Sequence, residues 1–278
     1  MRGERPVNAT ETAGTTRVAC WQPEWVAGRP YRAGFLSRLF LAAERAADGG
    51  AALLITPEMS ATGYHLGRAR TAELAEPDGG PLADGVRAIA ERTGVSIVYG
   101  WPELDGDRIY NSVRITGATT ARYRKTHLYG EFDNSVFSAG DELVVQATVG
   151  ALTVGLLVCY DVEFPETVRA HALAGTDLLI VPTALVRPWE VVACTLVPAR
   201  AFESQMFIAY VNWYSASADG YCGLSRVAAP DGTLLAECPP DRAETLFFAD
   251  LDPAVLTAAR RATPYLADRR PDLYGPAR

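Results

Sequence analysis

The chain has 278 residues, of which 49% are apolar and 21% charged, and its 26 Lys plus Arg against 33 Asp plus Glu give a net charge of −7. This composition excludes a disordered or fibrous protein, and the length fits one large domain or two small ones with a sizeable core. The acidic balance and the lack of any Lys/Arg run argue against nucleic acid or an anionic membrane surface as a partner.

The cysteines are odd in number and widely spaced, without a CxxC pair: Cys20, Cys159, Cys194, Cys222 and Cys238. A zinc site or a disulfide framework is therefore not expected. Residues 1–16 lack the apolar core of a secretory signal and are predicted to form a flexible N-terminal tail. No apolar run is long enough to span a membrane. We expect a cytoplasmic protein whose thiols stay reduced.

Short apolar runs alternate with amphipathic segments through the first half of the chain. In residues 35–48 the apolar side chains fall on one helical stripe, which Gly49 and Gly50 end. Asp105 and Gly106 are typical of a turn between two strands. The pattern predicts helices at 35–48 and 82–92 and strands at 18–21, 51–55, 95–99, 110–115 and 119–124.

The second half repeats this alternation and adds three strands at its end. It predicts helices at 166–174 and 190–203 and strands at 152–158, 178–181, 207–212, 224–229, 234–238 and 245–249. No Gly- or Ser-rich linker separates the halves, so we predict a single domain over residues 17–278. Mixed sheets with helices outside predict an α/β fold in which two sheets pack face to face under two helical layers.

Three chemically useful side chains follow three of the predicted strands. Glu58 comes just after the run AALLITP, Lys125 ends TTARYRK, and Cys159 ends ALTVGLLVC. Ligands of open α/β sheets bind at the carboxyl ends of strands. An acid, a base and a thiol arriving there on separate strands are therefore a candidate active site.

These residue types suit attack on an amide carbonyl. Cys159 would be the nucleophile and Glu58 the general base that activates it. Lys125 and the backbone N–H after Cys159 would stabilise the oxyanion. Glu58 would then protonate the departing ammonia and activate the water that cleaves the thioester. This chemistry requires no cofactor and no metal.

Each residue also has a structural interpretation. Cys159 could be an inert core thiol, as we expect for the other four cysteines, Glu58 a loop or cap carboxylate, and Lys125 part of a charged edge. A papain-type Cys-His pair would need His65, His127 or His171 beside Cys159, but structural roles are favoured for the last two. GxSxG, Walker A and GxGxxG motifs are missing from the sequence, so a serine hydrolase, an NTPase and a Rossmann enzyme are unsupported.

The segments around these three residues resemble the signature segments of the nitrilase, or carbon-nitrogen hydrolase, superfamily. They are ITPE at Glu58, YRKTHLYGEFD at Lys125 and GLLVCYDVEFPE at Cys159. The resemblance implies a four-layer αββα sandwich, a Glu-Lys-Cys triad, and a homodimer or higher homo-oligomer assembled as αββα-αββα. It places dimer contacts on the helices that start near Glu166 and Glu190.

The same resemblance implies a second glutamate near the triad, which orients the lysine and holds the substrate nitrogen. Glu131 is the best match and a further candidate catalytic residue, with Asp133 and Glu142 as competitors. Within the superfamily the chain is most similar to the amidase branch, and there to 5-aminopentanamidases, in segments such as YGWPE, YGEFD and PYLADRR. CYD after the nucleophile, where a true nitrilase would have CWE, favours amides over nitriles as substrates.

A small linear ω-amino or ω-guanidino carboxamide is the substrate that this likeness implies. Such a cation needs a carboxylate at the far end of its site and aromatic walls between. The candidate substrate-binding residues are Tyr64, Asp133, Tyr160, Trp189, Glu190 and Trp213, with Asp133 or Glu190 holding the cation. The alternatives are an N-carbamoyl amine hydrolase and a catalytically silent scaffold that binds partners through its dimer helices.

Overall fold

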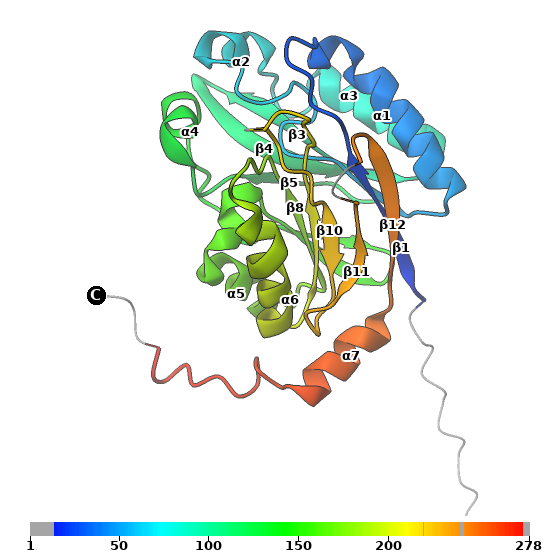
Figure 1. Ribbon diagram of the computed structural model, residues 1–278, viewed down its shortest axis with the longest axis vertical. Coiled ribbons are helices and arrows are strands. Elements are labelled where there is room, and N and C mark those ends of the chain that lie inside the picture. The colour runs from blue at the N-terminus through cyan, green and yellow to red at the C-terminus, as the bar shows by residue number, and fades with distance from the viewer. Residues whose placement is uncertain (1–13, 219, 240–241, 275–278) are drawn as a thin grey trace, which may run out of the picture.

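The computed structural model describes residues 14–218, 220–239 and 242–274, in which two mixed β-sheets lie between layers of helices (Figure 1). The first sheet has six strands within the described residues. Their order is β12 (Thr245–Leu251), β1 (Thr16–Gln22), β2 (Leu53–Ile55), β3 (Ser96–Asp105), β4 (Arg108–Thr116) and β5 (Ala121–Arg124).

The second sheet repeats this plan, again with six strands in the described part of the chain. Their order is β11 (Leu234–Glu237), β10 (Arg226–Ala228), β9 (Phe207–Val211), β8 (Leu178–Pro182), β7 (Leu152–Leu156) and β6 (Gln146–Val149). The central strands of both sheets are parallel and their neighbours antiparallel. Parallel strands end at the same edge, so the residues that follow them gather there.

Alternate residues of the first sheet's strands pack in opposite directions. Leu54 packs with Phe35 and Leu39 of α1 (Tyr31–Asp48), in a core that also includes α3 (Pro81–Thr93). Leu53 and Ile55, on the other face, join the core between the sheets. Since side chains alternate along a strand, this division gives a helical layer outside and a sheet inside.

The outer face of the second sheet is covered by α5 (Pro165–Leu173) and α6 (Val197–Ser204) (Figure 1). Val168 and Ala201 of these helices belong to the same buried core as β8 and β9. The layers therefore run helix, sheet, sheet, helix, which confirms the predicted α/β sandwich.

Most of the predicted elements are present with boundaries shifted by a few residues. β7 ends at Leu156, before the predicted end at 158. The predicted helix at 190–203 includes a π-helical stretch, η2 (Val192–Leu196), ahead of α6. Pro198 lies in the first turn of α6, and because proline has no N–H to donate, the regular helical ladder is interrupted there.

Several short elements were not predicted: α2 (Arg68–Leu74), α4 (Gly130–Val136), η1 (Cys159–Glu163), β6 and α7 (Pro253–Ala262). The predicted tail at 1–16 falls largely on residues 1–13, which lie outside the described residues, and Thr16 is already part of β1, paired with Leu251. In the described residues no helix has both the length and the apolar character needed to cross a membrane.

Candidate active site

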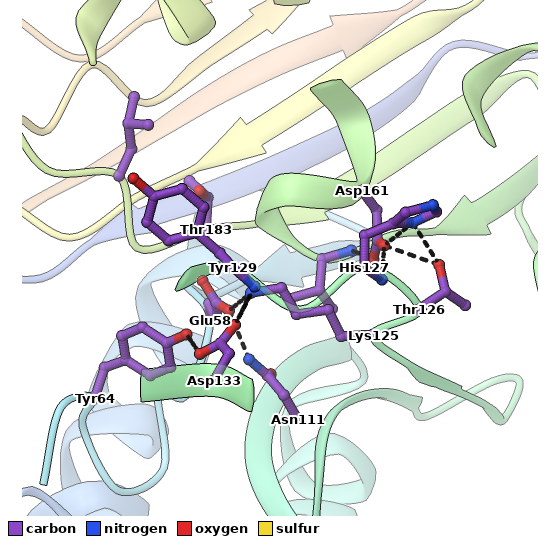
Figure 2. Close-up of polar contacts among 12 residues, drawn as sticks. Glu58, Tyr64, Asn111, Lys125, Thr126, His127, Tyr129, Asp133, Asp161 and Thr183 are labelled. Carbon is purple, nitrogen blue, oxygen red and sulfur yellow. Dashed lines mark hydrogen bonds and ion pairs between the residues drawn. The ribbon is translucent and has the colours of Figure 1, made fainter. Parts of the chain in front are cut away.

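The three predicted residues leave the two sheets at neighbouring strand ends. Glu58 follows β2, Lys125 follows β5, and Cys159 opens η1 just beyond β7. Glu58 is fully buried and Lys125 is 1% exposed, and the Lys125 Nζ donates to Glu58 Oε1 at 2.9 Å (Figure 2). The carboxylate after β2 and the ammonium after β5 are thus in direct contact.

The loop that carries Glu58 is held against β3 by backbone and hydroxyl contacts. The Thr56 hydroxyl donates to Ser60 Oγ at 2.7 Å, and the Ala61 N–H donates to the Gly100 carbonyl at 3.0 Å. A Cβ at Gly100 would lie 2.6 Å from the backbone nitrogen of Met59, so only glycine permits this approach. The loop therefore fixes the Glu58 carboxylate.

The lysine contacts a second carboxylate, and it belongs to Asp133. Nζ of Lys125 donates to Asp133 Oδ2 at 2.7 Å, and the same oxygen accepts from the Tyr129 N–H at 3.0 Å. The Tyr64 hydroxyl donates to the other oxygen of Asp133 (Figure 2). Asp133 is 1% exposed, so Lys125 lies between two buried acids.

Glu131 does not take the place predicted for it beside Lys125. It is exposed at the start of α4, and Asp133, two residues later, points into the site. Residues two apart on a helix lie on nearly opposite faces, so only one of the two acids can reach the lysine. Glu142 is also exposed. The acid that contacts Lys125 in the structure is therefore Asp133, one of the two competitors, and not Glu131.

Burial and charge set the protonation of these groups. Burial raises the pKa of the Glu58 carboxyl above its ordinary value of 4.5, and the charge of Asp133 adds to this effect against the lowering effect of Lys125. For Lys125 burial acts to lower the pKa, but the charge of Glu58 and its neighbours outweighs burial and raises the pKa well above 10.5. Lys125 is thus a fixed cation and Glu58 a stronger base than an ordinary glutamate.

Cys159 lies at a backbone position that few residues with a side chain adopt. Its φ is +48°, in the left-handed region, at the first residue of η1. Burial and the charge of Glu58 raise the pKa of its thiol, whereas Lys125, the Ala184 backbone and the Thr183 side chain lower it. The resting sulfur is therefore a thiol that needs a base, and Glu58 lies close enough to influence its charge.

Asp161 joins the lysine segment to the nucleophile segment. Its buried carboxylate accepts from the Tyr123 hydroxyl at 2.9 Å, from the His127 N–H at 2.8 Å and from the Val158 N–H at 3.1 Å. The His127 ring contacts Asp161 and stacks on Phe164 at 4.1 Å. His127 is thus part of this link (Figure 2).

The other histidines also have packing partners. His171 is buried and contacts Thr176 Oγ1 at 3.1 Å, and burial lowers its pKa to about 4. The ring of His65 packs on Tyr64 with a centroid distance of 4.5 Å. Among the contacts of the described residues, none links a histidine to Cys159 by a hydrogen bond, so the structure gives the Cys-His alternative no support.

A cavity of about 210 Å³ opens beside Cys159. Its wall includes two of the predicted substrate-binding residues, Tyr160 and Trp189. Tyr64, Asp133 and Trp213 are instead buried around the acids: the Trp213 indole N–H donates to the Glu58 carbonyl at 2.8 Å. Glu190 is partly buried and is not part of this wall.

Sequence reasoning missed two polar neighbours of the triad and one acid of the cavity. The Asn111 side-chain N–H donates to Glu58 Oε1 at 2.6 Å, and Thr183 lies against Cys159 at the end of β8. Glu163 lines the cavity from the end of η1. Asn111 could have been noticed as an amide within a buried strand, and Glu163 as the acid four residues after the predicted nucleophile.

The acids of this site are arranged around a lysine. Within the described ranges, no group of three or more His, Cys, Asp or Glu side chains is placed to hold a metal ion. Glu58 and Asp133 each contact Nζ of Lys125 instead. The arrangement provides a thiol, a buried carboxylate base and a fixed cation, the groups required for acyl transfer through a cysteine.

Comparisons with known proteins agree with this chemistry. Residues 17–261 match the carbon-nitrogen hydrolase family. A protein named hydrolase in pqqF 5'region, from Pseudomonas protegens, is 42% identical over 97% of this chain and 96% of its own length. An (R)-stereoselective amidase from a Pseudomonas species is 40% identical over 82% of both chains.

Solved structures include a variant of the amidase from Nesterenkonia sp. AN1. It is 30% identical, with a TM-score of 0.78, over 94% of this chain and 96% of its own. That structure has the acetamide moiety of fluoroacetamide attached covalently to the active-site cysteine. A reactive cysteine is thus established in a relative that has the same overall fold.

Proposed function

The chain belongs to the carbon-nitrogen hydrolase family, and from this membership we propose that it is an amidase that hydrolyses a small linear primary amide through a cysteine thioester. The contact of Lys125 with both Glu58 and Asp133, beside the cavity that Cys159 lines, is the observation that carries the proposal. The (R)-stereoselective amidase and the Nesterenkonia amidase support this class of reaction.

In the first step the Cys159 sulfur attacks the amide carbonyl carbon. Glu58 accepts the thiol proton as the C–S bond forms, which its raised pKa favours over an ordinary glutamate. The negative charge moves to the carbonyl oxygen. Lys125 and the N–H of Tyr160 would stabilise this oxyanion, because both lie on segments already fixed by Asp133 and Asp161.

In the second step the tetrahedral intermediate collapses and its C–N bond breaks. Protonated Glu58 gives its proton to the leaving nitrogen, so ammonia departs and a Cys159 thioester remains. Glu58 then takes a proton from a water molecule, which attacks the thioester carbonyl. The C–S bond breaks, the acid is released, and protonated Glu58 returns its proton to the sulfur, which restores both the thiol and the carboxylate.

We infer that the substrate is an ω-amino or ω-guanidino carboxamide. The resemblance of the segments YGWPE, YGEFD and PYLADRR to 5-aminopentanamidases supports this class, as does CYD rather than CWE at Cys159. Pockets for drug-sized ligands measure roughly 300 to 1,000 Å³, so the cavity of about 210 Å³ suits a smaller molecule. Tyr160 and Trp189 provide aromatic walls.

The experiment is ammonia release from five compounds, each with the unmodified protein and with Cys159→Ala. The compounds are 5-aminopentanamide, 4-guanidinobutanamide, hexanamide, an aliphatic nitrile and N-carbamoylputrescine. We expect hydrolysis of the first two that depends on Cys159 and exceeds that of hexanamide. Hydrolysis of N-carbamoylputrescine alone would replace the substrate class with N-carbamoyl amines, and no activity on any compound would contradict the amidase proposal.

We also propose that the chain forms a homodimer through α5 and α6, as the family resemblance implies. Leu173 on α5 and Phe202 on α6 are exposed apolar side chains on this side of the molecule. The segment after α7 approaches the same helices, with the Tyr265 ring edge-on to Phe202 at 5.5 Å (Figure 1). Light scattering during size-exclusion chromatography should give at least twice the chain mass of 29.9 kDa, and a monomer would contradict this.

A further inference from the structure

The cavity beside Cys159 combines apolar walls with a single carboxylate. Of the described residues that line it, Glu163 is the one whose side chain carries an acid. The remaining wall is aromatic or aliphatic: Tyr129, Tyr160, Trp189, Ala184, Leu185, Val186 and Val192. A carboxylate in such a wall calls for an explanation, because an apolar setting disfavours a charge without a partner.

The backbone of Glu163 is held firmly, but its carboxylate is not used for this. The Arg200 guanidinium donates to the Glu163 carbonyl at 2.9 Å and to the Val162 carbonyl at 3.3 Å. Its remaining terminal nitrogen donates to Glu203 Oε1 at 2.9 Å. Arg200 therefore fixes the end of η1 and forms its ion pair with a different acid.

Within the part of the chain that the structure describes, the Glu163 side chain has no hydrogen bond and no ion pair. Burial raises the pKa of this carboxyl, and the charges of Lys125 and Arg200 counteract burial only in part. The group is thus partly withdrawn from water without a direct cationic partner. A bound cation would supply that partner at this wall of the cavity.

We propose that Glu163 binds the distal cation of the substrate, an inference that rests on the amidase function proposed above. Glu163 and Cys159 lie at opposite ends of one short turn and line one cavity, so a linear molecule can reach both. Leu185 and Val192 are suited to contact its methylenes. The Trp189 ring, half exposed at the cavity, can cover an ammonium or guanidinium.

This assignment differs from the two acids that the sequence favoured for the same task. Asp133 is already bound to Lys125 and Tyr64 behind the triad. Glu190 is not part of the cavity wall. Glu163 is the acid whose position and lack of a partner both fit a cation that enters with the substrate.

The test compares 5-aminopentanamide with hexanamide, in which a methyl group replaces the ammonium. In Glu163→Gln we expect kcat/KM for 5-aminopentanamide to fall by about 10- to 100-fold, mainly through KM, and that for hexanamide to change less than about threefold. Glu91→Gln is the matched control, since Glu91 is an exposed acid on α3 that does not line the cavity and lies outside the proposed dimer helices. It should leave both values unchanged.

Binding to the inactive Cys159→Ala protein separates recognition from turnover. Calorimetry should show 5-aminopentanamide binding at least tenfold more weakly after Glu163→Gln is added. An unchanged preference for the cationic amide in Glu163→Gln would overturn the inference while leaving the amidase proposal intact. If the unmodified protein hydrolyses neither amide and Cys159→Ala binds neither, both proposals fail.

Glu163→Asp gives a second, conservative variant. It keeps the negative charge, but its side chain is shorter by one methylene, so the carboxylate lies farther from the substrate. We expect it to retain the preference for cationic amides and to shift it from 5-aminopentanamide toward 6-aminohexanamide. If Glu163→Asp lowered kcat/KM as much as Glu163→Gln for ω-amino amides of every length, this result would contradict a direct ion pair with the substrate.

Discussion

The two sheets contribute different kinds of surface to the active site. The first sheet and α4 supply Glu58, Lys125 and Asp133, which are 0% to 1% exposed and bound to one another. The second sheet supplies Cys159 and Glu163, which line a cavity whose wall is mainly apolar, and Thr183, which lies against Cys159. The first sheet's side of the site is a buried network of paired charges, and the second sheet's side is a cavity wall with few polar groups.

This contrast indicates that one side of the site serves the chemical steps and the other serves substrate recognition. A buried ion network tolerates no loss of a member, because each remaining charge would be left without a partner. It suits the proton transfers and charge stabilisation that every amide requires. The open side touches the variable part of a substrate, so changes there can alter preference without breaking the network. The following predictions test that division, from the largest effect to the smallest.

Removal of the nucleophile should abolish activity without unfolding the protein. We expect Cys159→Ala to lose at least about 10⁴-fold in kcat. The thiol is small and lies beside a cavity, so its loss removes little packing. Ammonia release and thermal unfolding check both parts. Measurable turnover in Cys159→Ala would place the nucleophile elsewhere.

Removal of the shared cation should damage both catalysis and folding. Lys125→Ala should lose about 10²- to 10³-fold in kcat through the oxyanion and about 3 to 5 kcal/mol of stability at pH 7, because it leaves two buried carboxylates without their cation. Burial raises the pKa of Glu58, so the folded variant takes up protons as the pH falls.

The stability lost in Lys125→Ala should therefore recover in part between pH 7 and pH 5, relative to the unmodified protein. Denaturant unfolding at the two pH values measures this. A stability deficit that is equal at both would show that no buried carboxylate is left uncompensated.

The two acids at the start of α4 offer a matched comparison. Asp133→Asn should reduce kcat/KM by about 10²-fold, since it removes one of the two carboxylates that orient Lys125. Glu131→Gln should change kcat/KM by less than about twofold, because Glu131 is exposed. Steady-state kinetics measures both changes in kcat/KM. A larger loss in Glu131→Gln than in Asp133→Asn would indicate that Glu131, and not Asp133, orients Lys125.

The smallest expected effect is a shift in the pH profile. Burial places the pKa of Glu58 above 4.5, so kcat/KM should fall as the pH decreases through that raised value. The hydrogen bond from Asn111 lowers this pKa, so Asn111→Leu should move the acid limb to higher pH. An acid limb that stayed in place or moved to lower pH would contradict the role of Glu58 as the base.

The sequence is informative where polar residues follow apolar strands. Glu58 and Cys159 are each preceded by a run of buried residues, so their position at strand ends follows from local patterning. Lys125 follows β5, a strand in which only Tyr123 is buried, so its pattern is weaker. The two sheets were predictable for the same reason. The short helices α2 and α4 and the edge strand β6 have little apolar periodicity of their own and were missed.

Contacts between segments that lie far apart in the sequence could not be predicted from local patterning. The choice of Asp133 over Glu131 depends on α4, a helix of seven residues that turns one acid inward and the other outward. The contact of Asn111 with Glu58 joins residues 53 positions apart, and the position of Glu163 in the wall depends on η1, which holds it at the same cavity as Trp189. Tertiary packing rather than local pattern fixes these relationships.

The central claim is that the substrate's acyl group is transferred to Cys159. The most direct measurement is mass spectrometry of the protein after acid quenching during turnover of 5-aminopentanamide, followed by peptide mapping. We expect an added aminopentanoyl group on the peptide that contains Cys159, and none on Cys159→Ala. Acylation of any other residue, or steady turnover by the Cys159→Ala protein, would contradict the account.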